Sequence, residues 1–146
     1  MTGFDFKNFG QSFGDDRGKV ESYEELVNIS HQFVIKVKQE HPNTKVFMCG
    51  MSMGGGVGFN LIAHHPNLVD GLVMISPGLR DNSKQLPLLK QIGMGLSYLT
   101  PWLKLIKSNG RNGSRYLLDD YNKNDPFMYH GRLWVKTFQQ LMLMME

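Results

Sequence analysis

The sequence has one cysteine among its 146 residues, no long uninterrupted apolar segment and no block of charge of one sign. A single cysteine, Cys49, excludes an internal disulfide and favours a reducing compartment. Because Cys49 lies inside an apolar run, we expect it to be a small buried core residue. The net charge of +3 is spread along the chain, which argues against a nucleic-acid partner.

No segment has the pattern of a targeting signal or of a membrane span. Asp5 and Lys7 interrupt the start of the chain, where a signal peptide would need an apolar stretch. The most apolar later region, residues 86–106, contains Lys90 and Pro101 and lacks the roughly 18 apolar residues of a spanning helix. We therefore expect a cytoplasmic location, with peripheral contact to membranes as the closest association.

The most informative segment is the pentapeptide G-x-S-x-G at residues 50–54. It lies between an apolar run at residues 45–49, typical of a buried strand, and a glycine-rich segment at residues 54–63, typical of a helix. A serine on such a strand-to-helix turn projects its hydroxyl off the sheet, and the next backbone N–H can bind an oxyanion. The pattern predicts Ser52 as a nucleophile and the Met53 N–H as an oxyanion-hole donor.

The first half of the chain predicts alternating helices and strands. Ser22-x-x-Glu25 is a capping box that begins a helix, which ends near His41. The apolar stripe of this helix is predicted to consist of Leu26, Ile29, Phe33 and Val37. An apolar run at residues 69–76 is typical of a parallel strand covered on both faces. This order of elements predicts an α/β fold.

The second half predicts mainly helices. Residues 86–106 predict one or two amphipathic helices broken at Pro101, and Gly131 precedes a final helix. The apolar positions of that final helix are Phe138, Leu141, Met142 and Met145. We therefore expect a partial core at residues 1–80 and a helical cap, itself incomplete, at residues 81–146.

Several of these segments resemble the α/β-hydrolase superfamily, in particular its monoacylglycerol lipase and lysophospholipase group of serine aminopeptidase S33 type. The matching segments are residues 3–5, 10–14, 52–55, 76–77 and 124–131. The first two are similar to the family's D-x-R-G-x-G-x-S-x-G loop, in which Lys7-Asn8 here replaces arginine and glycine. The fold class implied is α/β, a partial α/β-hydrolase fold with a helical cap region.

The resemblance implies a lipase-like hydrolase of carboxylic esters that acts through an acyl-enzyme and uses no cofactor or metal. Its substrate would be a lipid ester, a monoacylglycerol or a lysophospholipid. Residues 86–106 would cap the acyl pocket and touch membrane, although ordinary packing explains their apolar side chains equally well. In the family, the Asp and His of the catalytic triad follow the serine in the chain. We expect neither of them among these 146 residues, so the chain resembles a central fragment of a hydrolase.

No base for Ser52 is evident in the chain. His64 and His65 close the helix that Ser52 begins, roughly 15 Å from its hydroxyl, and Asp70 begins a strand on the wrong side of the sheet. The residues better explained as solvated or capping are His31, His41, Asp119, Asp120 and Asp125. Asp81 only follows the end of a strand, and His130 of the cap is the one histidine whose approach to Ser52 stays open, without a catalytic assignment. We therefore predict negligible esterase activity for the chain alone, and poor solubility because the strand before Ser52 exposes an edge.

Three hypotheses about function stay open. The first is an ester hydrolase whose base comes from outside this chain. The second is a non-catalytic truncated paralogue or fragment that serves as an interaction module. The third is acyl transfer by the same serine, which the sequence does not distinguish from hydrolysis.

Overall fold

The computed structural model describes residues 1–79, 87–107 and 132–145. It contains two compact units, one formed by Met1–Val20 and Leu88–Phe138, the other by Glu21–Pro87 and Gln139–Glu146. Within the described ranges, no helix is both long enough and apolar enough to cross a bilayer. The division into a core (1–80) and a cap (81–146) stays a prediction.

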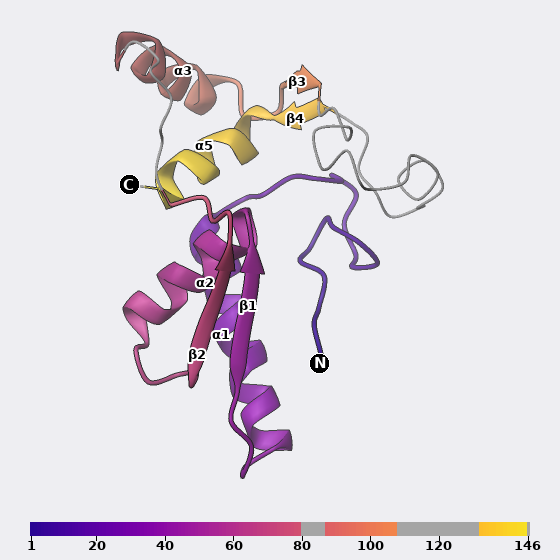
Figure 1. The fold of residues 1–146 in the computed structure, drawn as a ribbon. Helices are drawn as coiled ribbons and strands as arrows, with labels where there is room; N and C mark the ends of the chain where they lie inside the picture. The colour runs from indigo at the N-terminus through magenta and orange to yellow at the C-terminus, as the bar shows by residue number, and fades with distance from the viewer. Residues whose placement is uncertain (80–86, 108–131, 146) are drawn as a thin grey trace, which may run out of the picture. The chain divides into compact units, whose positions relative to one another are not determined.

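The unit of Glu21–Pro87 and Gln139–Glu146 is built on two parallel strands. Strand β1 (Phe47–Met51) pairs with β2 (Gly71–Ile75), and helix α2 (Met53–His64) connects them (Figure 1). Two parallel strands joined by a helix form the β-α-β arrangement that the order of elements predicts. The α/β class is thereby confirmed.

Helix α1 (Tyr23–Glu40) packs against α2. The Ser22 hydroxyl accepts a hydrogen bond from the Glu25 N–H (3.2 Å), and the chain leaves the helix at His41, as predicted. The buried positions of the helix are Leu26, Ser30 and Val34. The other members of the predicted stripe, Ile29, Phe33 and Val37, are half-buried, so the most buried line of the helix runs through Ser30 and Val34 beside that stripe. Ser30 tolerates burial because its hydroxyl donates to the Leu26 carbonyl (2.8 Å).

The core of this unit lies on one face of the sheet. Its buried members are Val34 of α1, Leu61 of α2 and Leu68, which precedes β2. The half-buried hydrophobic residues packed against them are Val27, Val46, Met48 and Val69. Since residues of both helices and of β1 meet in this cluster, α1 and α2 cover the same face of the sheet (Figure 1).

Helix α5 (Val135–Met144) buries more polar side chains than its sequence predicts. The buried positions are Val135, Thr137, Gln139, Gln140 and Met144, whereas the four predicted apolar positions are half-buried. Thr137 and Gln140 are buried because they hydrogen-bond to the chain that precedes or begins α1, whereas the buried side-chain amide of Gln139 has no partner among the described residues. For example, the Gln140 side-chain oxygen accepts from the Tyr23 N–H (3.0 Å), which satisfies a free donor at the start of α1.

The other unit contains α3 (Pro87–Leu99), β3 (Lys104–Lys107) and β4 (Arg132–Trp134). The predicted helix is confirmed as far as Leu99, but its continuation to residue 106 was wrong. Thr100 and Pro101 end the helix, and the chain then pairs antiparallel with β4. Because that pairing partner lies almost thirty residues further along, no local pattern indicated it.

The amino-terminal loop of this unit is organised around Asn8. This residue is 4% exposed and has a φ of 70°, in the left-handed region where glycine and asparagine are tolerated best. Its backbone N–H donates to the Phe13 carbonyl (3.1 Å), its carbonyl accepts from the Gly18 N–H (2.9 Å), and its side-chain amide donates to the Lys19 carbonyl (3.0 Å). Asparagine therefore replaces the expected glycine of the loop without loss of the turn.

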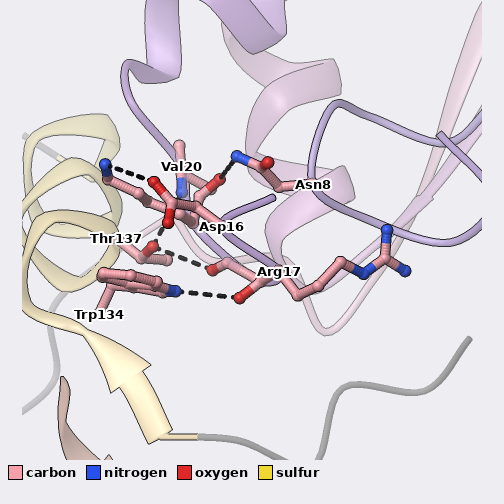
Figure 2. A network of polar contacts seen from close by, with 8 residues as sticks. Asn8, Asp16, Arg17, Val20, Trp134 and Thr137 are labelled. Carbon is pink, nitrogen blue, oxygen red and sulfur yellow. Dashed lines mark hydrogen bonds and ion pairs between the residues drawn. The ribbon is translucent and has the colours of Figure 1, made fainter. Parts of the chain in front are cut away.

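A polar network ties this loop to β4 and α5, as Figure 2 shows. The Trp134 indole N–H donates to the Arg17 carbonyl (3.0 Å). The Thr137 hydroxyl accepts from the Val20 N–H (2.9 Å) and donates to the Gly18 carbonyl (3.1 Å). The Thr137 side chain thus satisfies two buried backbone groups, more than a hundred residues away in sequence.

Replacing Thr137 with valine is expected to destabilise the unit by ~2–4 kcal/mol, since it leaves the Val20 N–H and the Gly18 carbonyl buried without partners. Valine has nearly the same shape, so the loss reflects hydrogen bonding and not a cavity. Urea unfolding followed by tryptophan fluorescence measures the effect. Thr137→Ser retains the hydroxyl and should lose clearly less stability; equal losses in the two variants would contradict the assignment.

Candidate functional site

Ser52 stands at the turn between the end of β1 and the start of α2, with an exposed side chain. Its backbone has φ 51° and ψ −116°, a combination that costs an L-residue ~1–3 kcal/mol. Its hydroxyl makes no capping hydrogen bond to α2, although serine is among the best capping residues. The turn therefore holds a strained serine whose hydroxyl is not engaged by the helix that it begins.

Three backbone hydrogen bonds hold this strained conformation in place. The Ser52 N–H donates to the carbonyl of Ile75, the last residue of β2 (2.9 Å). The Ser52 carbonyl accepts from the N–H groups of Gly78 (3.1 Å) and Gly56 (3.2 Å). The neighbouring strand, the chain that leaves it and the first turn of α2 thus fix the turn jointly. In the sequence, Pro77-Gly78 only follows the apolar run at residues 69–76, and nothing in that pattern indicated that Gly78 holds the Ser52 turn.

Close approaches of neighbouring atoms explain Gly50 and Gly55. A Cβ added at Gly50 would lie 2.4 Å from the Gly54 carbonyl oxygen, and one added at Gly55 would lie 2.8 Å from the Cβ of Pro77. Gly54, the second glycine of the pentapeptide, has no such neighbour: a Cβ there would meet no atom within 4 Å. Packing therefore demands glycine at the first motif position and directly after the motif.

The predicted oxyanion donor, the Met53 N–H, stands at the start of α2. Met53 is the first residue of α2, so its N–H has no carbonyl to bond within the helix. The positive end of the helix dipole lies at the same place and favours developing negative charge. Such a donor, one residue after an exposed serine, suits the stabilisation of an oxyanion on a group bound to that serine.

The described histidines lie away from Ser52. His64 is the last residue of α2, so about twelve helical residues, or ~18 Å, separate it from the serine. His65 stacks on His31 of α1 with their ring centroids 4.2 Å apart, and His41 caps the end of α1. None of these four imidazoles is placed to accept the Ser52 proton.

The carboxylates in the described part of this unit also have other roles. Asp70 precedes β2, and its side chain accepts from the Val46 N–H (2.8 Å) while its own N–H donates to the Val46 carbonyl (2.8 Å). It thus joins the amino-terminal ends of the two parallel strands, the opposite end from Ser52. The candidates that lie outside the described residues are Asp81, Asp119, Asp120, Asp125 and His130.

Cys49 corrects a prediction. It was expected to be buried, but it is exposed. Along β1 the exposed residues alternate, with Phe47, Cys49 and Met51 on the face opposite the core. The apolar pattern correctly predicted a strand. It contained no information on whether both faces of that strand are covered, and in this structure one face is exposed.

The chain is similar to known proteins along its whole length. Residues 1–146 match the family described as "Serine aminopeptidase, S33". Monoglyceride lipase from Rattus norvegicus is 30% identical over 129 residues, which cover 86% of this chain and 42% of the lipase. Monoacylglycerol lipase from Mycolicibacterium smegmatis is 27% identical over 131 residues, which cover 88% of this chain and 46% of that lipase.

A solved structure agrees with these matches at the level of the fold. The monoacylglycerol lipase of Paleococcus ferrophilus superposes with a TM-score of 0.68 at 24% identity, over 97% of this chain and 53% of the lipase. The chain thus spans about half the length of the proteins that it matches. On the match over its whole length, the chain belongs to the serine aminopeptidase S33 family, and it has a partial α/β-hydrolase fold.

Proposed function

We propose that this chain supplies the nucleophile half of a serine hydrolase of carboxylic esters. The observation that carries the proposal is the strained, exposed Ser52 at the strand-to-helix turn, held by three backbone hydrogen bonds. Strain of this kind persists where the surroundings enforce it, and it is common at active sites. A hydroxyl presented in this way is open to an ester carbonyl from the solvent side.

In the proposed reaction, the Ser52 hydroxyl oxygen attacks the ester carbonyl carbon and gives up its proton to a base. The Met53 N–H donates to the oxyanion of the tetrahedral intermediate. Collapse expels the alcohol and leaves an acyl-serine, which water hydrolyses to release the acid. No histidine in the described part of the chain is placed to be the base, and we propose that a histidine oriented by an aspartate from outside this chain supplies it.

The relatives suggest the substrate class. Their names are monoglyceride lipase and monoacylglycerol lipase, so we propose a monoacylglycerol or a similar lysolipid as substrate. We also propose that residues 86–106 contact a lipid surface. The exposed apolar side chains of α3 and the turn after it support it, namely Leu96, Tyr98, Leu99, Trp102 and Leu103.

A chimera tests the proposal. In it, this chain replaces the matching stretch of the M. smegmatis lipase, so that the rest of the relative supplies the missing residues. We expect the chimera to hydrolyse a monoacylglycerol and to react with a fluorophosphonate at Ser52, and the 146-residue chain alone to do neither. A folded chimera without either property would favour the non-catalytic alternative, an interaction module.

A further inference from the structure

A groove lies between the carboxyl-terminal ends of α1 and α2, at the end of α2 opposite to Ser52. Its volume is about 640 Å³, within the range of small-molecule sites. The lining residues that carry the argument are Ile35, Lys38, His64, His65, Pro66 and Leu68. All of them belong to one compact unit of the chain, so the groove is a feature of that unit alone.

The basic side of the groove contains no acidic residue. Lys38 is half-buried, and its ammonium donates to the Leu68 carbonyl (3.0 Å). It pairs with no carboxylate among the described residues, and Glu40, the nearest carboxylate in sequence, lies beside Lys36 instead (3.9 Å). An ammonium has three N–H donors, so Lys38 can donate to a ligand while it keeps its bond to Leu68.

Two imidazoles line the same groove. His64 and His65 are exposed, and the His65 ring stacks on that of His31 with the centroids 4.2 Å apart and the planes 20° apart. The stack holds the His65 ring in place. An imidazole has an N–H donor in either protonation state, so Lys38 and the two histidines together offer several donors to one anionic group.

Basic residues also occur at helix ends for a simpler reason, because they complement the partial negative charge of a carboxyl-terminal end. This accounts for a basic residue in the last turn of each helix, Lys38 in α1 and His64 in α2. It does not account for the bond from the Lys38 ammonium to Leu68, which lies beyond α2 and outside α1. The ammonium is therefore directed across the groove and not back to the carbonyls of its own helix.

The remaining side of the groove is apolar. Ile35 and Pro66 are exposed, and Leu68, which is 8% exposed, joins the groove to the hydrophobic core. A basic side next to an apolar side suits a ligand with an anionic head and a hydrocarbon chain, since each buried methylene group contributes ~0.8 kcal/mol. A small anion without a chain would leave the apolar side uncovered.

We propose that this groove binds a fatty-acid anion. Its carboxylate accepts hydrogen bonds from Lys38 and the two imidazoles, and the first part of its chain lies along Ile35, Pro66 and Leu68. The reaction proposed above releases such an acid, so the source of the ligand rests on the proposed function, whereas the binding does not. Because the groove is ~18 Å from Ser52, the bound acid does not occupy the position of the ester.

Protection of histidines from diethyl pyrocarbonate tests the proposal in the 146-residue chain. Mass spectrometry measures the modification rate of each histidine with and without decanoate, below its critical micelle concentration. We expect saturating decanoate to slow modification of His64 and His65 roughly 5-fold or more. His41, exposed at the end of α1 and outside the groove, should react at an unchanged rate. Decanol has the same chain without the charge and inorganic phosphate has charge without the chain, so each should protect clearly less.

Two lysines of α1 make the result specific to the groove. Lys38→Gln should raise the decanoate concentration for half-protection about 10-fold or more, because a charge-assisted hydrogen bond is lost and the two helix ends then repel the carboxylate. Lys38→Arg keeps the charge and should retain most of the affinity. Lys36→Gln is the matched control, since Lys36 lies beside Glu40 and does not line the groove, and it should leave the protection unchanged.

Other results overturn the proposal. Equal protection by decanol would show an apolar groove without a role for charge, and equal protection by phosphate would show an anion site without a role for the chain. Absence of protection by decanoate, or equal weakening by Lys36→Gln and Lys38→Gln, would show that the fatty acid does not bind here. If Lys38→Gln failed to fold, as judged by circular dichroism, the comparison of the three ligands on the unaltered chain would still decide. None of these measurements requires hydrolysis, so their outcome is independent of the activity of the chimera.

Discussion

Replacing Ser52 with alanine in the chimera is expected to lower kcat for a monoacylglycerol by at least ~10³-fold, because it removes the atom that attacks the ester. KM should change little, since the hydroxyl contributes to bond formation more than to substrate binding. The variant is measured by release of fatty acid and by loss of fluorophosphonate labelling. Its fold should be intact, because the Ser52 hydroxyl makes no capping bond to α2 and the backbone bonds to Ile75 and Gly78 remain.

Ser76 provides the matched control for this prediction. It is also exposed and also has a positive φ, 45°, and it follows the parallel strand next to β1. Ser76→Ala is therefore a serine-to-alanine change in a similar backbone setting, and it should leave most of the activity. If both variants were equally active, or if Ser76→Ala were the inactive one, Ser52 would not be the nucleophile.

Local signals in the sequence predicted the features that depend on local structure. The turn at Ser52, the cap at Ser22 and the ends of α1 and α2 at histidines were all predicted within one or two residues. In each case the determinant is a neighbour within about four positions: a glycine that permits close approach, a hydroxyl that caps, or a following proline. The α/β class followed from the order of these elements.

Features that depend on distant pairing were not predicted. The strand at residues 104–107 is stabilised by β4, and the buried Thr137 is satisfied by a loop more than a hundred positions away. The exposure of Cys49 is of the same kind, since an apolar strand has the same sequence whether or not its second face is covered. Hydrophobic periodicity predicts whether a segment forms a helix or a strand, whereas the segments that pack against it decide which of its faces is buried.

Gly50→Ala is expected to destabilise the fold by more than ~3 kcal/mol, because the added methyl group would overlap backbone and not a movable side chain. Its Cβ would lie 2.4 Å from the Gly54 carbonyl oxygen, 2.6 Å from the Gly54 carbonyl carbon and 2.8 Å from the Gly55 nitrogen. To relieve these contacts, the first turn of α2 must move away from the end of β1. That movement would also weaken the hydrogen bonds from Ser52 to the chain around β2.

Gly54→Ala distinguishes the structural roles of the two glycines of the pentapeptide, Gly50 and Gly54, which the sequence pattern treats as equivalent. A Cβ at Gly54 meets no atom within 4 Å, and the residue is helical, so alanine should be neutral or stabilising by up to ~1 kcal/mol. Urea unfolding of the two variants, in the chain and in the chimera, measures the difference. Equal losses of stability in the two variants would mean that both glycines serve only to make the backbone flexible. A large loss of stability in Gly50→Ala alone would show that the close approach of α2 to β1 requires glycine at residue 50.

The clash at Gly50 also predicts that the Gly50→Ala chimera loses fluorophosphonate labelling in its folded fraction. The reason is that Ser52 can keep its strained backbone only while α2 remains against β1.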